Sequence, residues 1–587
     1  MKTKSFWWIS LFAAISSSCT NMLDEKPLST LSPESLFNTT ADIESSLNGM
    51  YRGLGENTTS PNGNWKVLYP VFGWGIMGTD ELSIRPNNTS QQSRFSRYTL
   101  TAGDDQLINN WYCLYNVINR ANTIIAYAEQ ADVSPDYLQQ AIGEALFMRA
   151  FCYMDLVQFY GGVPLRLVPT ENIKTALGLP RASEQEVWAR IIEDLTNAEQ
   201  VLPSTAAPGR ATKWAAKGLL AKAYLIRGGY PVGKYAEREW FEKAAAKAYE
   251  VIEGSGISLN PTTPGSPGAF VEYGKQFMVS GKNSPESIFE IQFLEGDFGS
   301  GWGYRTISGD LSQYSGEYGS YFAANGGTAI SMDFALSFDD NDIRFQWSIG
   351  PFTVSNGLRS SVALTQWMPH KHRWESRPPN SWESSMNAIV LRMADIYLIF
   401  AEAYNEANDG PSGWGAYPID AFDAINVVRN RAQVTPLTAD YLLKDSPYAT
   451  EDLLYGISLA SFDKSNANYD GRHVYYKGSL KERFRDAVLM ERAWELCFER
   501  HRWFDLKRTN RLLEFASQAK MGMRGRLASV ADPIDKSNFD GRNQTPAISG
   551  TAYPPSDIRD HHVYLPIPNI EIQLNPEISQ ADQNPGY

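Results

Sequence analysis

Apolar side chains recur at helical spacing through two long stretches near the start of the chain, residues 104–130 and 134–161. This spacing predicts a helix in each stretch. Ser134 and Pro135 are suited to begin the second helix, and Gly161 is suited to end it. Its apolar residues form two stripes, one through Ile142, Ala145, Cys152, Leu156 and Phe159, the other through Leu146, Ala150, Tyr153, Val157 and Tyr160. We therefore expect this helix to be packed on two sides.

Further helical patterns follow in series, at residues 183–202, 211–228 and 236–253. An earlier helix is expected from about Pro33, with Ser32 as its cap. Helices in such a series pack as antiparallel pairs, which is typical of tetratricopeptide-like folds. The strict repeat motif is absent, so the prediction is limited to repeat-like packing.

The helical pattern stops between residue 254 and about residue 385, where Gly, Pro, Ser and aromatic residues dominate. One short stretch here, "ESIFEIQF", predicts a strand. Helical patterns then return at residues 388–408, 418–432 and 479–515, and a proline-rich tail is expected to lie extended on the surface. The fold class predicted is mainly α, a tetratricopeptide-like helix-pair scaffold with a loop-rich, partly β insertion region.

The first residues have the order of an export signal. Lys2 and Lys4 precede an apolar stretch, small residues follow, and Cys19 comes directly after them. This order is that of a bacterial lipoprotein signal, in which the cysteine is acylated, although Ser16 stands where leucine is usual. A soluble secreted protein cut near Ser18 is the alternative. We expect a signal at 1–18, then one folded unit divided into parts 19–253, 254–385 and 386–587.

Composition narrows the functional classes. The net charge of -13 disfavours nucleic-acid binding, which needs a basic face. The mature chain has no apolar run of roughly 20 residues that could span a bilayer. Cys113, Cys152 and Cys497 are irregularly spaced within helical patterns, so they predict buried free thiols and neither a disulfide framework nor a zinc site.

The run "ELCFERHRWFDLKR", residues 495–508, has the residue types of an active site. Cys497 and His501 are one helical turn apart, but a reactive thiol needs an exposed, electropositive setting, and Cys497 lies on an apolar stripe. Acidic and basic residues recur every three positions, which predicts helix-surface ion pairs Glu499–Arg502, Arg502–Asp505 and Asp505–Arg508. The run is therefore interpreted as a structural frame without catalysis.

No metal or cofactor site is predicted. The close pairs His370/His372 and His561/His562 lack a third ligand nearby in sequence. Asp339, Asp340 and Asp342 have the acid density of a calcium site, but they lack the glycine and distal glutamate of a calcium loop. A solvated turn is the preferred interpretation of these three residues.

The best candidate for ligand binding is the stretch 296–327, which holds nine glycines and seven aromatic residues. Rings in a glycine-rich polar loop have no helical stripe to join, so their faces can stack on sugars while polar groups reach hydroxyls. The candidates are Trp302, Tyr304, Tyr314, Tyr318 and Tyr321 here, with Trp65, Trp74, Asp80, Arg85 and Asn87 in a second patch. The alternative is that these rings hold the loops to the scaffold or face a partner protein.

Five segments, in order along the whole chain, resemble the SusD/RagB family of outer-membrane nutrient-binding lipoproteins of Bacteroidetes. They are "CTNMLDEKP", "EALFMRAFCYMDLVQFYGGVPL", "LRMADIYLIFAEAYNEA" with "AINVVRNRA", "ERAWELCFERHRWFDLKR" and "LPIPNIEIQLNPEISQADQNPGY". The resemblance implies a mainly helical, surface-exposed lipoprotein that caps a TonB-dependent SusC-like transporter and captures oligosaccharides without catalysis. The family usually has glycine where His501 stands. Peptide capture, as in RagB-like members, and a glycoside hydrolase with two carboxylates remain alternatives.

Overall fold

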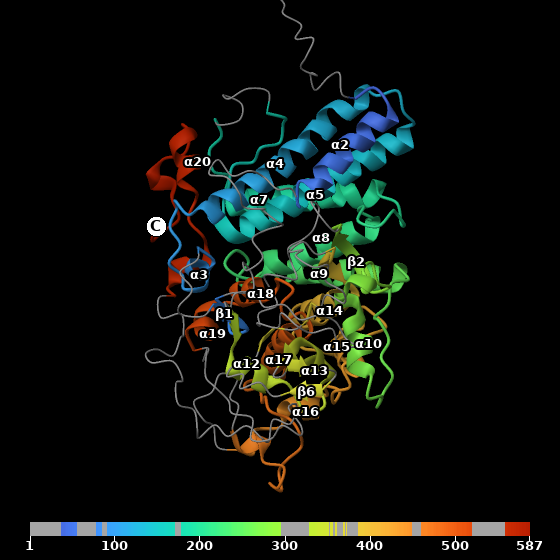
Figure 1. The fold of residues 1–587 in the computed structure, drawn as a ribbon, viewed down its shortest axis with the longest axis vertical. Helices are drawn as coiled ribbons and strands as arrows, with labels where there is room; N and C mark the ends of the chain where they lie inside the picture. Colours follow the sequence, from blue (N-terminus) through green and yellow to red (C-terminus); the bar gives the residue numbers. More distant parts are fainter. Residues whose placement is uncertain are drawn as a thin grey trace, which may run out of the picture.

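The structure is a computed structural model. It describes residues 37–55, 78–84, 91–170, 178–294, 328–350, 353–355, 358–360, 368–369, 371–372, 385–448, 459–518 and 558–587. Helices dominate, and the strands of the described part form four small two-stranded sheets. In Figure 1 the N-terminal helices fill the upper half and the C-terminal helices the lower half. This arrangement confirms the mainly α fold class.

The N-terminal half is a series of packed helices. Its elements are α2 (Thr40–Arg52), α3 (Gln91–Ser96), α4 (Asp105–Tyr127), α5 (Pro135–Tyr160), α7 (Glu184–Val201), α8 (Lys213–Gly228) and α9 (Arg238–Gly254). From α4 to α9 each long helix packs on the next, and α9 continues the series onto α14 (Met393–Asn408). The predicted repeat-like packing is therefore confirmed. The expected cap Ser32 and start at Pro33 lie outside the described residues.

The predicted ends of α5 are confirmed. The Ser134 hydroxyl accepts a hydrogen bond from the Tyr137 amide, and Gly161 ends the helix with φ of 72°. A φ in this left-handed region favours glycine. Almost the whole second half of α5 is buried, because both of its apolar stripes pack against neighbouring helices.

The middle region holds short elements. They are α10 (Ala269–Gly274), β2 (Ser287–Ile291), α12 (Met332–Ser337), α13 (Ile343–Ser348) and five further strands: β3 (Thr328–Ile330), β4 (Ile349–Gly350), β5 (Thr353–Ser355), β6 (Leu358–Ser360) and β7 (Met368–Pro369). Strand β2 confirms the strand predicted in "ESIFEIQF". The helices of this region have six residues each, which is too short to show a periodic pattern in the sequence.

The helix predicted at 388–408 was wrong at its start. Residues Ala388–Arg392 form β8, which pairs antiparallel with β2 in a register that places Ile291 opposite Ala388. The sequence "AIVLR" is apolar on both faces, and such a short buried run cannot be told from a helix by periodicity alone. Helix α14 begins directly after it, at Met393.

The single helix predicted at 479–515 is three helices. They are α17 (Leu480–Glu495), α18 (Arg502–Arg508) and α19 (Leu512–Gln518), and the other C-terminal helices are α15 (Ala421–Arg431) and α16 (Ala439–Leu443). Between α17 and α18 the chain turns through Phe498 and Arg500, whose φ values are 61° and 70°. A left-handed backbone is costly for such side chains, so the surrounding contacts must hold the turn in place.

The tail does not lie simply extended on the surface. It contains α20 (Asn569–Leu574), and it returns to the N-terminal half beside α4, as Figure 1 shows in red. The Leu565 amide donates to the Phe159 carbonyl at 2.7 Å, and the Asn584 side-chain amide donates to the Tyr160 carbonyl at 3.0 Å. Leu565 and Ile567 are buried, so the tail is part of the core.

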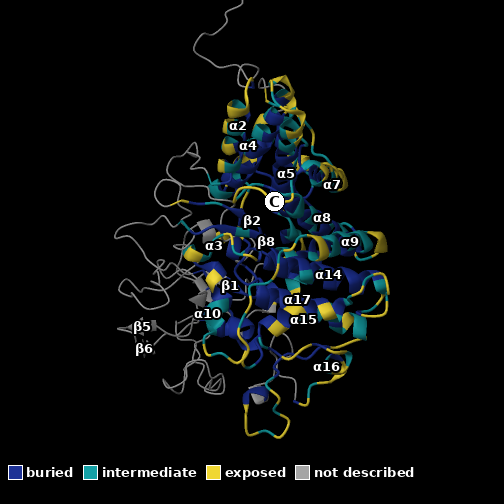
Figure 2. Ribbon diagram, turned by 90° about the vertical axis from the view of Figure 1, so that its right-hand side faces the viewer, coloured by how far each residue is buried: buried dark blue, intermediate teal, exposed yellow. Residues whose placement is uncertain are grey.

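One apolar core runs through both halves of the molecule, and Figure 2 shows its buried helices in dark blue. Among the described residues, no helix is long and apolar enough to cross a membrane.

Candidate ligand-binding face and its buried frame

In the structure, two short strands connect the two aromatic segments that are predicted to bind ligand. Strand β1 (Leu82–Ile84) follows the aromatic part of the first segment and precedes its Arg85 and Asn87, and β3 follows the second segment. The two strands pair antiparallel, with Leu82 opposite Ile330 and Ile84 opposite Thr328. The Ser331 amide extends the pairing by donating to the Glu81 carbonyl at 3.2 Å. The two segments are therefore anchored side by side here.

The N-terminal ends of the two segments also meet. Gly55 is the last described residue before the first segment, and Phe293 lies just before the second. A Cβ atom on Gly55 would lie 3.0 Å from the Phe293 ring, so the Gly55 backbone packs against that ring. We call residues 78–84 and 328–331, where β1 and β3 pair, the loop base. The described residues before the two segments are thus in contact with each other, and the loop base joins the segments a second time.

Nine of the ten predicted ligand residues lie outside the described residues, and their roles stay predictions. They are Trp65, Trp74, Arg85, Asn87, Trp302, Tyr304, Tyr314, Tyr318 and Tyr321, and the predicted lipidation site Cys19 lies outside as well. Asp80 is described, and its prediction was wrong. It is completely buried, and its two carboxylate oxygens accept from the Arg502 guanidinium at 2.8 and 2.5 Å. Its charge is used to hold the loop base.

The run 495–508, which we call the frame segment, is buried along nearly its whole length. Its first acid, Glu495, accepts from Arg392 at 2.6 Å and also pairs with Arg344 and Arg431. Its second acid, Glu499, pairs with Arg392 and Lys371. Because these charges lie in a low-dielectric interior, losing one partner leaves an uncompensated charge that costs about 3–5 kcal/mol.

The second half of the frame segment joins the helices of both halves of the chain. Asp505 accepts from Arg492 at 2.9 Å and from Arg508, and Arg508 also pairs with Glu402 of α14. Arg492 donates to Asp395 at 2.7 Å, and Asp395 also accepts from Lys222 of α8. The segment is therefore a structural frame, as predicted.

The partners of this frame segment were partly mispredicted. Of the three expected helix-surface pairs, only Asp505–Arg508 forms. Glu499 and Arg502 pair with residues of other elements, because the helix is interrupted between them and both side chains point into the interior.

The thiol and the imidazole of the frame segment are held in unreactive forms. Burial raises the pKa of Cys497 to about 12, so the thiol is protonated at neutral pH. Burial and the neighbouring Lys222 lower the pKa of His501 to about 3, so the imidazole is neutral. The Lys222 amine lies 2.9 Å from the His501 ring. Cys113 and Cys152 are buried free thiols too, as predicted.

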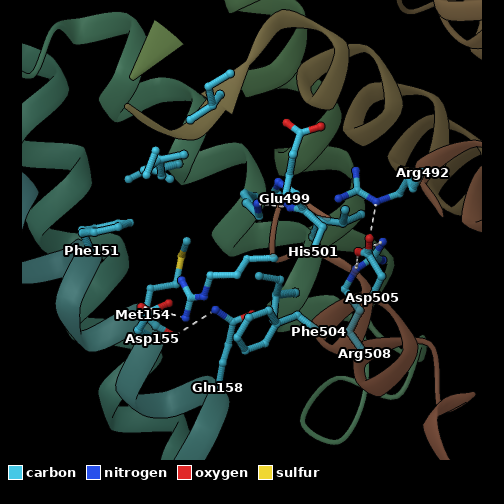
Figure 3. A pocket seen from close by; sticks show the side chains of 18 residues that line it. Phe151, Met154, Asp155, Gln158, Arg492, Glu499, His501, Phe504, Asp505 and Arg508 are labelled. Carbon is cyan, nitrogen blue, oxygen red and sulfur yellow. Dashed lines mark hydrogen bonds and ion pairs between the residues drawn. The ribbon is translucent and has the colours of Figure 1, made fainter. Parts of the chain in front are cut away.

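A small cavity lies between the frame segment and the helices it joins. Figure 3 shows Phe151, Met154 and Asp155 of α5 on one side, facing Phe504 and Asp505 across it. Its volume is about 60 Å³. One water requires about 10–15 Å³ on this measure, so the cavity has the size for a few waters and not for a sugar chain.

The acidic run at 339–342 is neither a calcium loop nor a solvated turn. Asp342 caps α13 and pairs with Arg344, Asp339 pairs with Arg429, and Asp340 lies 3.0 Å from His473. Paired acids of this kind have little capacity left for a metal ion. Within the described ranges, no group of three His, Cys, Asp or Glu side chains is placed to hold one.

Several residues of this architecture were not foreseen, notably Arg344, Lys371, Arg392, Arg429 and Arg431. Each is at most a few per cent exposed. Arginine is almost never fully buried unless paired. Arg392, Arg429 and Arg431 lie inside apolar patterns, and this position could have indicated that they are buried. Their ion-pair partners could not be predicted, because they are distant in sequence.

Comparison with known proteins identifies the family. A model described as the SusD family matches residues 359–587, and one described as "Starch-binding associating with outer membrane" matches residues 21–225. The chain is 27% identical to SusD-like protein P25 of Formosa agariphila, over 97% of each chain.

Solved structures show the same fold. A SusD homolog from Bacteroides thetaiotaomicron has a TM-score of 0.69 at 22% identity, covering 94% of this chain and 98% of its own. A laminarin binding SusD-like protein has a TM-score of 0.63 at 20% identity, covering 94% of this chain and 100% of its own. With models matching both of its ends and relatives matching nearly its full length, the chain belongs to the SusD/RagB family.

Proposed function

We propose that this protein binds oligosaccharides at the cell surface and delivers them, without chemical change, to a SusC-like TonB-dependent transporter in the outer membrane. The observation that carries the proposal is the loop base, where the pairing of β1 with β3 joins two aromatic-rich segments that are far apart in sequence on a SusD-family scaffold. A structural relative is described as laminarin binding, which supports a glycan as the ligand class.

The chemistry of the two segments suits a sugar chain. The rings of Trp302, Tyr304 and Trp74 offer flat apolar faces, and Arg85 and Asn87 offer hydrogen-bonding groups for hydroxyls. A sugar ring has an apolar C–H face and a polar rim, so it needs both kinds of group at once. A peptide would need backbone donors and acceptors in register, which favours a glycan over the peptide alternative.

Catalysis is not part of the proposal. A glycoside hydrolase needs one carboxylic acid with a raised pKa to protonate the leaving group. In the frame segment, the pKa values of Glu499 and Asp505 are lowered instead. Burial alone would raise the pKa of Glu499, but Arg392 and Lys371 outweigh it and lower the pKa to about 2. Arg492 and Arg508 lower that of Asp505 to about 2 in the same way.

The ligand class is tested by a glycan-array screen of the mature protein, followed by calorimetry of the best binder. We expect saturable binding without turnover. Tyr112→Ala is a control, since Tyr112 is an exposed aromatic residue on the helical scaffold, in α4. Binding of peptides but no glycan would favour the RagB-like alternative, and product formation would favour the hydrolase.

The anchor is tested separately. The order of basic, apolar and small residues before Cys19 supports lipidation of that cysteine. Multiple acyl chains give firm attachment, whereas one chain binds only marginally. Cys19→Ala is expected to leave the protein folded but to release it from the outer-membrane fraction. Absence of radioactive fatty acid on the wild-type protein would contradict this part of the proposal.

A further inference from the structure

A second aromatic surface lies on the loop 409–420, which joins α14 to α15. The loop holds Trp414 between two glycines of left-handed conformation, Gly413 with φ of 87° and Gly415 with φ of 67°. A Cβ atom on either glycine would meet no atom within 4 Å. Space beside the Trp414 backbone is therefore open.

The loop is fixed to its scaffold by hydrogen bonds. The Trp414 amide donates to the Tyr404 hydroxyl at 2.8 Å, and the Ala421 amide donates to the Pro411 carbonyl at 3.0 Å. The Asn408 side-chain amide donates to the Ser412 carbonyl at 2.6 Å. A ring on such a loop loses little conformational freedom on binding, which favours affinity.

Three half-buried rings form one surface, which we call the Trp414 platform: Tyr249 of α9, Trp414 and Tyr417. The Trp414 and Tyr417 rings are 5.3 Å apart at 79°, and the Tyr417 and Tyr249 rings are 4.9 Å apart. Rings this close touch one another and leave no room for a cation between them. A ligand must therefore lie across their outer faces.

The polar tips of these rings take no part in the hydrogen bonds that hold the loop. Among the described residues, no protein acceptor binds the Trp414 indole N–H, and no protein group binds the Tyr249 or Tyr417 hydroxyl. A buried aromatic tip usually finds a partner, so tips without one are available to water or ligand. The platform thus combines apolar faces with free hydrogen-bonding groups.

The acids nearest the platform are partly balanced by cations, since Glu242 pairs with Arg238 and Glu250 with Lys247. Burial, followed by the Glu242 and Glu250 carboxylates, raises the pKa of Tyr417. Glu253 lies one helical turn after Tyr249, is exposed, and has no ion pair within the described part of the chain. Carboxylates accept hydrogen bonds from hydroxyls and repel anions. The exposed Glu253 carboxylate can therefore accept a hydrogen bond from a sugar hydroxyl and disfavours a uronic or sulfated chain.

We propose that the Trp414 platform is a second binding site for a neutral glycan chain, separate from the loop base. In Figure 2, α9 and α14 lie on the right and β1 lies toward the left, so the two sites are on different sides of the molecule. The site extends the proposed function by letting one protein hold a long polysaccharide at two points.

The test is retardation of the full-length mature protein in native gels that contain laminarin, xyloglucan or alginate. The variant Trp414→Ala/Tyr417→Ala removes the platform. Trp240→Ala is the matched control, because Trp240 is a half-buried tryptophan of α9 whose ring contacts the Lys243 amine and the Arg227 guanidinium at 4.7 and 4.9 Å. A second variant, Trp302→Ala/Tyr304→Ala, removes the predicted primary site. Melting curves accompany every variant.

We expect the platform variant to weaken retardation by laminarin or xyloglucan about tenfold, while its melting temperature falls no more than that of the Trp240→Ala control, which should be retarded like the wild type. Alginate should not retard the wild-type protein. Unchanged retardation of the platform variant would overturn the platform while leaving the proposed function intact. Loss in the platform variant alone, with no loss in Trp302→Ala/Tyr304→Ala, would support the platform and contradict the primary site. Failure of both neutral polymers to retard the wild-type protein would overturn the platform proposal.

Discussion

The two halves of the molecule are held together in different ways. In the N-terminal half, helices that are neighbours in sequence pack through apolar stripes, and one of the few fully buried ion pairs there joins Arg149 to Asp194, 45 residues apart. In the frame segment, Arg392 and Glu495 are 103 residues apart, and Asp80 and Arg502 are 422 apart. The first half is built by local patterns, and the second by long-range charge pairing.

This difference has a functional meaning. Apolar helix pairs give a stiff scaffold, but they do not specify where a distant loop attaches. A buried ion pair has one correct partner geometry, since a misplaced charge in a low-dielectric interior is costly. The Asp80–Arg502 pair, with the Phe498 amide donating to Glu81 at 3.3 Å, therefore fixes the loop base against the frame segment.

The largest effect should come from removing one cation of the frame. Arg392→Met removes one cation partner from each of Glu286, Glu495 and Glu499 and leaves the buried cluster one positive charge short, so we expect a loss of about 3–5 kcal/mol in the free energy of unfolding. Urea denaturation measures it. The control Arg238→Met breaks an exposed pair with Glu242 and should cost about 0–1 kcal/mol. Equal losses of unfolding free energy in the two variants would show that the buried pairs of the frame stabilise the protein no more than an ordinary surface pair.

Removing an apolar anchor of the frame should be nearly as costly. Trp503 is completely buried, and its ring packs against Phe159 of α5 at 5.8 Å between centroids. Trp503→Ala should lower the free energy of unfolding by about 3–5 kcal/mol, through lost burial and a cavity. Thermal unfolding checks this. A variant that stayed stable but lost ligand affinity would assign the ring to binding.

Acid should weaken the frame through His501. The pKa of this residue is lowered to about 3 in the folded protein, whereas an unfolded histidine titrates near about 6.5. The unfolded chain therefore binds an extra proton between these values, and stability falls as the pH drops from about 6.5 toward 3. Glu499 and Asp505, with pKa values lowered to about 2, add a loss in the same direction at still lower pH, below their unfolded pKa of about 4.

The measurement is the free energy of unfolding at pH 6.5 and pH 5. The folded state should lose up to about 2 kcal/mol through His501 over this interval, because one pKa unit corresponds to about 1.4 kcal/mol. His501→Gln should remove this part of the pH dependence, whereas the buried His372, whose pKa is also lowered to about 3, keeps its own part. His561→Gln, a change in the half-buried tail histidine that stacks on His562, should keep the wild-type pH dependence. A His501→Gln protein with the wild-type slope would show that another group causes the loss.

The smallest effect is expected for the ligand affinity of a His501 variant. His501 is buried between Lys222 and Asp395 and lies in the frame segment, so His501→Ala should leave ligand affinity unchanged although it changes stability. Calorimetry with the best glycan binder checks this prediction. A large change in affinity would mean that the frame takes part in recognition.

The sequence predicted the local features well. Periodicity and capping residues, which act over a few positions of the chain, predicted helix α5 with its ends at Ser134 and Gly161, the series of helices to α9, and strand β2. The mistakes occur where the determining contact is distant. Strand β8 is defined by its pairing with β2, and the break after Glu495 is defined by ion pairs to other elements.

The candidate site shows the same limit. Composition identified two aromatic segments, but nothing local predicts that their bases pair through β1 and β3, because the strands have three residues each. Asp80 was misassigned for the same reason. A lone acid beside an aromatic patch has the same sequence signature whether it contacts a ligand or Arg502.

The central claim is that binding resides in the segments held by the loop base and that the frame only supports them. Calorimetry of wild-type protein, Trp302→Ala and Tyr304→Ala with the best neutral array binder tests it most directly, with melting curves alongside. A stacked ring contributes roughly 1–3 kcal/mol, so Trp302→Ala should weaken affinity about tenfold or more at an unchanged melting temperature. Unchanged affinity in both variants would contradict the claim and remove the 296–327 segment from the site.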